Sequence, residues 1–139
     1  MAVEQTLARV PLFSGVKEKE LKKLGKRMQE RSFGEGEVVT TQGETGLGFF
    51  VIEDGNASVS RNEQIVRNLG PGDFFGEVAL IDEGPRSATV VATTDLRCRG
   101  MTAWEFKPFV EEHPEVAWAL LQTLVGRLRE AESALNLGA

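Results

Sequence analysis

The chain has one cysteine, one histidine and no apolar run that approaches the length of a membrane span. A single cysteine, Cys98, makes an intramolecular disulfide impossible, so the sequence fits a reducing cytoplasm. We expect Cys98 to be a small buried apolar residue in a strand. Crossing a bilayer takes roughly 18 consecutive apolar residues, and the N-terminus lacks the basic flank and apolar stretch of a signal peptide. The sequence therefore predicts a cytoplasmic protein without a membrane contact.

The same scarcity limits the chemistry that the chain can perform. Metal catalysis needs several imidazole or carboxylate ligands that converge on one point, and His113 is the only histidine. Because Pro114 is well placed to begin a helix, we interpret His113 as a helix-boundary residue. No nucleophile–base pair and no metal cluster is visible in the sequence. We therefore predict neither an enzyme nor a metal site.

Composition places the chain among ordinary globular domains. The net charge of −5, from 16 basic and 21 acidic residues, argues against a nucleic-acid-binding face. The apolar fraction of 41% and the charged fraction of 27% are typical of a soluble protein. A length of 139 residues suffices for one domain with a real core. We predict a single domain over residues 1–139.

Two helical segments open the chain. Residues 3–9 place apolar side chains on one side, and Lys17–Glu30 repeats apolar residues at helical spacing. The lysines of the second segment are interleaved with glutamates, which indicates a solvated helix face. We therefore expect N-terminal helices within residues 1–32.

From residue 33 to residue 102 the sequence changes to short runs of β-branched and aromatic residues separated by glycine-containing turns. The run Asn56–Arg61 alternates, with Ala57 and Val59 on one side. Many short strands with regular turns favour a small barrel or jelly roll. We therefore predict an α+β fold: a β-roll, similar to a jelly-roll barrel, flanked by N-terminal helices and a long C-terminal helix. The expected strands are Val38–Gln42, Gly48–Glu53, Asn56–Arg61, Gln64–Leu69, Ser87–Thr93 and Asp95–Thr102.

Helices are expected again over residues 103–137. Ala103–Glu111 predicts a short helix that buries its aromatic residues against the roll. The last helix, Pro114 to about Asn136, carries apolar residues at alternating spacings of 4 and 3, the pattern of a coiled-coil seam. The aromatic residues of the first helix are Trp104, Phe106 and Phe109; the seam is Ala117, Leu121, Leu124, Leu128, Ala131 and Leu135; and the face expected to pack on the roll is Val116, Leu120 and Trp118.

The seam suggests how two copies of the chain could associate. It extends over fewer than three heptads, which is too short to be stable alone. Packed against the roll on its other face, the helix could still pair with a second copy. We predict a homodimer, and the alternative is that the seam only caps its own domain. The predicted dimer contacts are Leu121, Leu124, Leu128 and Leu135.

The stretch Phe75–Val90, FGEVALIDEGPRSATV, is suited to bind a small anion. Gly76 lacks a Cβ, so a ligand can approach the backbone closely, and the short helical turn expected after it favours negative charge. Arg86 can donate two parallel hydrogen bonds to a phosphate, whereas Glu77 can accept hydrogen bonds from hydroxyls. One acceptor and one cation suit a sugar phosphate with one negative charge. The segment therefore predicts a nucleotide site.

This stretch resembles the phosphate-binding cassette of cyclic nucleotide-binding domains, a family that includes bacterial catabolite activator proteins, regulatory subunits of cAMP-dependent protein kinase and cyclic-nucleotide-gated channels. The resemblance implies that Glu77 accepts from the ribose 2′-hydroxyl and that Arg86 binds the cyclic phosphate. Backbone or hydroxyl hydrogen bonds would come from Gly76, Ala79 and Ser87. The cassette residues that the resemblance places at the ligand are Phe75, Gly76, Glu77, Val78, Ala79, Arg86, Ser87 and Ala88.

The resemblance extends over roughly residues 5 to 133. It implies that Val59 and Val66 line the cavity beside the base, although the residues alone indicate only core valines. Catabolite activators place a Thr-Ser pair of the last helix against the adenine, whereas this chain has Ala131-Glu132 there. The possible base contacts in this lid are Arg127, Arg129, Glu132 and Ser133.

The function that the resemblance implies is a sensor that binds a cyclic nucleotide and signals through its C-terminal helix. Ser87 permits cAMP or cGMP, and we favour cAMP because the chain's family affinities look bacterial. No other cofactor is implied. The alternative is an oligomerisation or interaction domain that keeps the fold and ignores nucleotides, but such relatives usually lack the Glu or the Arg. The expected helix-turn-helix of family transcription factors is not present before Ala139, so the chain is either a stand-alone sensor or part of a larger protein.

Overall fold

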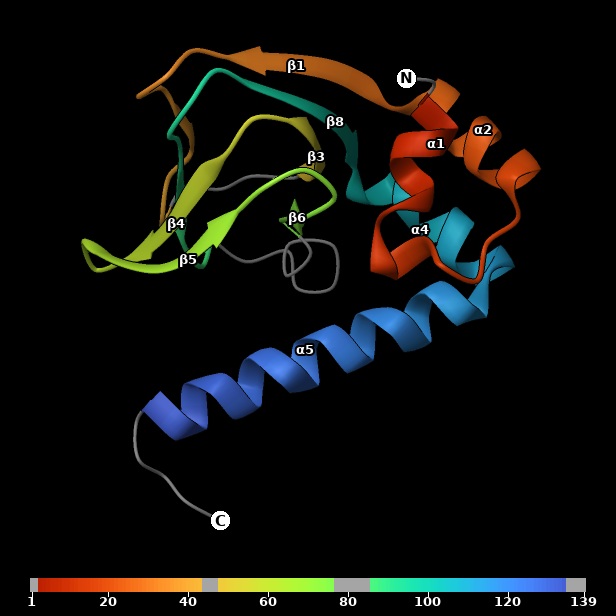
Figure 1. Cartoon of the computed structure of the whole chain (residues 1–139). Helices are drawn as coiled ribbons and strands as arrows, with labels where there is room; N and C mark the ends of the chain where they lie inside the picture. The colour runs from red at the N-terminus through yellow and green to blue at the C-terminus, as the bar shows by residue number, and fades with distance from the viewer. Residues whose placement is uncertain (1–2, 44–47, 77–85, 135–139) are drawn as a thin grey trace.

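The computed structural model describes residues 3–43, 48–76 and 86–134. Its strands form two antiparallel four-stranded sheets, in the orders β1-β8-β3-β6 and β2-β7-β4-β5. In Figure 1, α1, α2 and α4 gather at one end of this β-roll, and α5 runs from them along the roll. This arrangement confirms the predicted α+β fold. The elements are α1 (Val3–Ala8), the 3₁₀ turn η1 (Pro11–Phe13), α2 (Glu18–Arg27), β1 (Gln29–Phe33), β2 (Val38–Thr40), β3 (Gly48–Asp54), β4 (Ala57–Arg61), β5 (Gln64–Leu69), β6 (Phe74–Phe75), β7 (Thr89–Ala92), β8 (Leu96–Thr102), α4 (Ala103–Glu112) and α5 (Pro114–Ala134).

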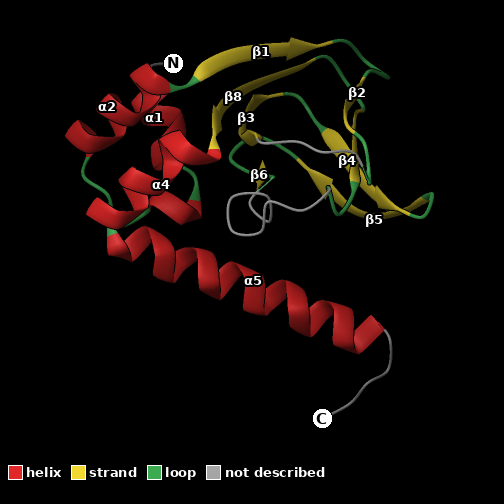
Figure 2. Cartoon of the chain, turned by 180° about the vertical axis from the view of Figure 1, so that it is seen from behind, coloured by secondary structure: helices red, strands yellow, loops and turns green. Residues whose placement is uncertain are grey.

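Strand β3 separates two hydrophobic cores. Phe49 and Val51 are fully buried in the core that the sheet shares with the helices, which we call the helix core. Ile52 is fully buried in the core enclosed by the two sheets, the roll core, and Phe50 packs against it. Successive side chains of a strand point to opposite faces, and a strand buried on both faces is a continuous apolar run. The separate helical and strand layers are also visible from behind in Figure 2.

The predicted helix Lys17–Glu30 is too long at its C-terminal end. Helix α2 ends at Arg27, and β1 (Gln29–Phe33) follows, so the β-roll begins before residue 33. The first four side chains of β1 are polar and exposed, and only the last, Phe33, is apolar, so no apolar alternation marks it as a strand. Residues Gln29–Phe33 form a strand because all of them pair with β8. The pairing also brings Glu30 Oε2 to 3.7 Å from Arg99 Nη2.

The other predicted strands agree closely with the structure. Strand β5 (Gln64–Leu69) has the predicted bounds, whereas the short β6 (Phe74–Phe75) was not predicted. In β4 the alternation is incomplete, because Ser58 is buried as well as Ala57. Cys98 is fully buried in β8, which confirms the predicted role.

Helix α4 confirms a predicted helix but not all of its burial. A capping box begins it, in which the backbone N–H of Thr102 donates to Oε1 of Glu105 at 3.2 Å. The hydroxyl of Thr102 donates to the same oxygen at 2.7 Å, and the hydroxyl bond followed by the backbone bond lowers the pKa of Glu105. Phe106 and Phe109 are buried in the helix core, as predicted. The prediction for Trp104 is wrong, because its side chain is 65% exposed. Trp104 lies about 200° around the helix from Phe106, so the two cannot face the same core.

Helix α5 packs on the helix core through Val116 and Leu120, as predicted. The prediction for Trp118, expected to pack on the protein, is wrong, because its side chain is 65% exposed. Leu124, expected in the seam, is partly buried and packs against the helix core, and its role in a dimer stays a prediction. We call the exposed apolar residues of α5 the outer stripe; they are Trp118, Leu121, Val125 and Leu128, while Leu135 lies outside the described residues.

Phe106 and Trp104 form a matched pair for a stability test. We expect Phe106→Ala to lower the free energy of unfolding by about 3–5 kcal/mol, because it leaves a cavity in the helix core. Trp104→Ala removes an exposed aromatic ring from the same helix, and we expect a change below about 0.5 kcal/mol. Equilibrium urea denaturation followed by circular dichroism measures both. Equal losses in the two variants would contradict the assigned buried face of α4.

Candidate functional site

The predicted site residues flank the segment that connects β6 to β7. Phe75 ends β6 and Gly76 follows it, whereas Arg86 precedes β7. A Cβ built on Gly76 would lie 2.9 Å from Nη1 of Arg86, so the two ends of the predicted cassette meet. Three predicted ligand-binding residues, Glu77, Val78 and Ala79, lie outside the described residues.

Gly76 has a backbone conformation that favours glycine. Its φ angle is +88°, in the left-handed region. A Cβ there would also overlap the carbonyl oxygen of Gly48 at the start of β3. The missing side chain therefore permits a close approach inside the protein, where Gly76, the backbone of β3 and the guanidinium of Arg86 meet. The close approach of a ligand to Gly76 stays a prediction.

Arg86 carries the charge of the site. Its side chain is half-buried, and Nη1 donates a hydrogen bond of 2.9 Å to the carbonyl oxygen of Gly48. Burial lowers the pKa of Arg86 from its usual value, yet an arginine stays protonated at physiological pH. A neutral carbonyl does not cancel this charge. An anion bound at the guanidinium is therefore attracted more strongly than at a fully exposed arginine, because less water screens the pair.

The backbone of the C-terminal part of the cassette is held by residues from other segments of the chain. The N–H of Gly43 donates to the carbonyl oxygen of Arg86 at 2.9 Å, and Nε of Arg61 donates to the carbonyl oxygen of Ser87 at 3.1 Å. Ser87 is exposed, whereas Ala88 is buried. The backbone of Arg86 and Ser87 is thus held by hydrogen bonds, and the hydroxyl of Ser87 lies at the surface.

An aromatic pair lies next to the Arg86–Gly48 contact. The rings of Phe50 and Phe75 stack with centroids 5.2 Å apart and an interplanar angle of 20°. Val59 is half-buried and packs against the roll core, as expected of a core valine. Val66 is 53% exposed on β5, so its prediction as a core valine is wrong. A role of either valine beside a base stays a prediction.

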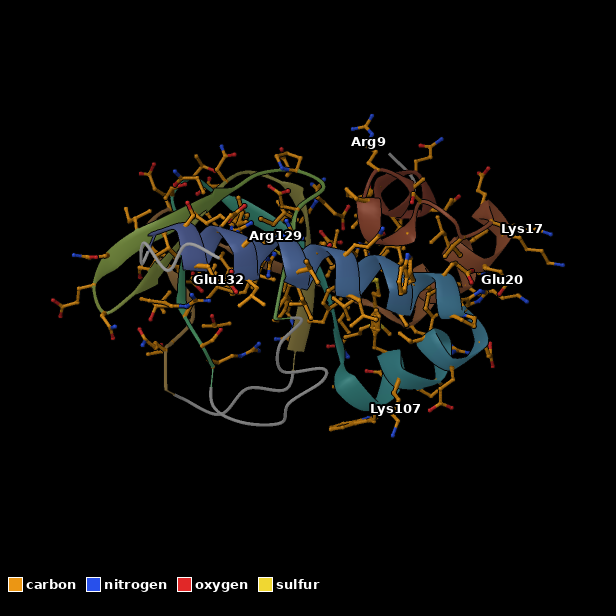
Figure 3. The ribbon with its side chains drawn as sticks, turned by 90° about the horizontal axis from the view of Figure 1, so that it is seen from below. Arg9, Lys17, Glu20, Lys107, Arg129 and Glu132 are labelled. Carbon is orange, nitrogen blue, oxygen red and sulfur yellow. The ribbon has the colours of Figure 1, made fainter. Side chains whose placement is uncertain are left out.

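Among the lid candidates, Arg127 contacts the roll. Its Cζ lies 5.5 Å from the centre of the Phe74 ring, a cation–π distance. Burial, followed by the charge of Arg67, lowers the pKa of Arg127. Figure 3 shows two other candidates on the end of α5 that crosses the roll, away from the N-terminal helices. Arg129 and Ser133 are exposed, and Glu132 is half-buried.

An ion pair that the sequence did not predict joins α5 to the roll. Nη2 of Arg67 in β5 lies 2.8 Å from Oε2 of Glu130. The two side chains are 35% and 68% exposed, so solvent screens the pair. The partners are 63 positions apart, and neither belongs to a periodic pattern or motif. Local sequence therefore held no signal for this contact.

Three further observations concern metal ligands, the cysteine and the helices of the described residues. Among them, no group of three or more His, Cys, Asp or Glu side chains is placed to hold a metal ion. Burial, together with the charge of Glu53, raises the pKa of Cys98 to about 12, so its thiol is not a nucleophile at neutral pH. In the same part of the chain, no helix combines the length and apolarity needed to span a membrane.

Comparisons with known proteins agree with the resemblance seen in the sequence. The model of the cyclic nucleotide-binding domain matches residues 30–113. A CRP-like cAMP-activated global transcriptional regulator of Mycobacterium tuberculosis is 30% identical over 138 residues, which cover 96% of this chain and 62% of that protein. A cAMP-dependent protein kinase regulatory subunit of Mycosarcoma maydis is 40% identical over 109 residues, which cover 73% of this chain and 21% of that protein.

Comparison with solved structures indicates the same family. The Thermus thermophilus catabolite activator protein superposes with a TM-score of 0.83 and 31% identity, covering 91% of this chain and 62% of that one. The cAMP-bound structure of PfPKA-R superposes with a TM-score of 0.84 and 27% identity, covering 98% of this chain and 47% of that one. The chain thus spans less than two thirds of the length of these relatives. Because the matched residues 30–113 make up more than half of the sequence and extend on both sides of Arg86, the chain belongs to the family of cyclic nucleotide-binding domains.

Proposed function

We propose that the chain binds a cyclic nucleotide, with cAMP preferred and cGMP as the second candidate, and signals through α5. The observation that carries the proposal is the half-buried guanidinium of Arg86, held against Gly76 and Gly48 inside the matched region. Relatives whose names or structures include cAMP support this choice of ligand. The exposed Ser87 is compatible with either nucleotide. No further cofactor is required.

In this proposal Arg86 binds the cyclic phosphate, and Glu77 accepts a hydrogen bond from the ribose. A cyclic phosphate has one negative charge, which one permanently charged guanidinium can match with parallel hydrogen bonds. In this proposal the ligand is bound and not chemically changed, as expected of a chain similar to a transcriptional regulator and to a kinase regulatory subunit. An oligomerisation domain that ignores nucleotides is less well supported, because the chain keeps both Glu77 and Arg86.

The role of Arg86 is tested by Arg86→Ala. We expect the variant to bind cAMP about 30-fold to several thousand-fold more weakly, because the phosphate loses its charge partner at a cost of roughly 2–5 kcal/mol. Isothermal titration with cAMP and cGMP side by side measures the effect and the ligand preference. Arg31→Ala, an exposed arginine of β1, is the matched control and should keep the wild-type affinity. Wild-type affinity in Arg86→Ala would refute the assigned role.

The contacts of α5 support a signalling role for its distal part. The proximal part is fixed by Val116 and Leu120 in the helix core. The distal part contacts the roll through Arg127 on Phe74 and through the solvent-screened pair of Glu130. Such contacts stabilise less than apolar burial, so this part of the helix can change position at low cost. A ligand that favours one position shifts the equilibrium toward it.

Hydrogen exchange along α5 tests this signalling step. We expect saturating cAMP to change amide exchange in the helix from Arg127 onward, because that part contacts the roll beside the site. The segment from Val116 to Leu120 serves as the internal control, and its exchange should change little. Identical exchange of the distal segment with and without ligand, under conditions where titration shows binding, would count against α5 as the signalling element.

The outer stripe of α5 supports a homodimer. Its four residues recur at spacings of 3, 4 and 3, which suit a helix that pairs with a second copy. All four are large apolar side chains that remain about half or more exposed in the single chain. The predicted contacts Leu121 and Leu128 belong to this stripe, and Val125 takes the place of the partly buried Leu124.

Sedimentation velocity tests the dimer. We expect the wild type to sediment as a dimer and Leu128→Glu to sediment as a monomer, because a carboxylate at the helix contact must be desolvated or repelled. The side chain is exposed in the single chain, so the fold should be unaffected. Gln122→Glu, an exposed position beside the stripe, is the charge-matched control and should remain dimeric. A monomeric wild type at high concentration would exclude this association.

A further inference from the structure

Two glycines contact Arg86 from the two ends of one connection. The N–H of Gly43, which follows β2, donates to the carbonyl oxygen of Arg86 at 2.9 Å. The carbonyl oxygen of Gly48, the first residue of β3, accepts from Nη1 of Arg86 at 2.9 Å. One contact fixes the backbone of Arg86 and the other fixes its side chain. We call this pair of contacts the glycine clamp.

Both clamp positions require glycine, for different reasons. Gly43 has a φ angle of +85°, a conformation that L side chains rarely adopt, and nothing lies within 4 Å of the position of its Cβ. At Gly48 the limit is space, because a Cβ would lie 2.8 Å from the ring of Phe50. Each position therefore requires glycine for a structural reason, and at each position the backbone of that glycine forms a hydrogen bond with Arg86.

The carbonyl oxygen of Gly48 is itself fixed by packing. The ring of Phe50 lies against Gly48 and against Gly100 of β8, where a Cβ would be 2.6 Å from it. Phe75 stacks on the same ring, with centroids 5.2 Å apart. These contacts restrict the movement of the Gly48 backbone, so its carbonyl oxygen is a fixed acceptor for the guanidinium.

We propose that Gly43 and Gly48 are positioning residues that orient the Arg86 guanidinium before a ligand arrives. The identity of the ligand in this inference rests on the proposed function. The bond from Nη1 to Gly48 restrains the guanidinium and uses one of its donors, and Nε and Nη2 are then the nitrogens that can donate in parallel to a phosphate. A long side chain that is ordered in advance loses less rotamer entropy on binding, so the clamp raises affinity for the anion.

The chain provides a matched control for Gly43. Gly36, between β1 and β2, also has a φ angle of +85° and nothing within 4 Å of its Cβ position. Its N–H donates to the carbonyl oxygen of Ala92 at 2.7 Å and not to Arg86. Gly43→Ala and Gly36→Ala therefore impose the same backbone strain without a steric clash, and only the first disturbs the clamp.

The first measurement is isothermal titration of both variants with cAMP. We expect Gly43→Ala to bind about tenfold more weakly, the equivalent of about 1.4 kcal/mol, and Gly36→Ala to stay within about twofold of the wild type. Both variants should lower the Tm by similar amounts, since they carry the same strain. If the wild type binds cAMP and the two variants lose the same affinity, or neither loses any, the clamp is refuted and the proposed function stands.

The second measurement needs no ligand. In ¹⁵N NMR spectra of the free protein, the hydrogen bond to Gly48 should slow the rotation of the Arg86 guanidinium. We expect faster rotation in Gly43→Ala and no change in Gly36→Ala. If the wild type fails to bind cAMP, the proposed function is wrong, and this experiment decides the clamp on its own. Unchanged rotation in Gly43→Ala would overturn it.

Discussion

A positive charge held partly out of water is the constraint on which the site depends. Removing a guanidinium from water is costly unless hydrogen bonds and an opposite charge compensate it. The protein supplies Arg86 with a carbonyl partner at Gly48, and that contact is possible only because Gly76 leaves room beside it. The neutral carbonyl satisfies a donor but leaves the charge in place. An anion is attracted more strongly to such a partly buried, uncompensated charge than to an exposed arginine, because less water screens the pair.

The two cores explain how a site inside the roll can influence a helix outside it. In β6, Phe75 packs in the roll core against Phe50, while its neighbour Phe74 packs in the helix core and contacts Arg127 of α5. Adjacent residues of a strand point to opposite faces, so one short strand touches both the ligand side and the helix side. Under the proposed function, a displacement of β6 at the site moves the surface that Arg127 of α5 contacts, without a longer chain of contacts.

The sequence predicted features that depend on local pattern and missed those that depend on pairing. The bounds of β5 follow from a β-branched run between turn residues, and the burial of Phe106 follows from helical spacing. Strand β1 is polar and exposed, and only its partner β8 makes it a strand, so its residues were assigned in part to a helix. The contacts of Gly48 with Arg86 could not be predicted for the same reason: they join residues that only the folded roll brings together.

The distal part of α5 is held by contacts whose net free energy is small. An exposed ion pair such as that of Glu130 contributes about 0.2–1 kcal/mol, and a cation–π contact contributes about 0.5–2 kcal/mol, with the larger values where burial partly desolvates the cation, as at Arg127. Gly126 lowers the stability of the helix itself by about 1 kcal/mol relative to alanine. Nothing lies within 4 Å of its Cβ position, so packing does not require glycine there. A helix that is weakened here and held to the roll in part by a solvent-screened ion pair can change its position when a ligand favours one position over another.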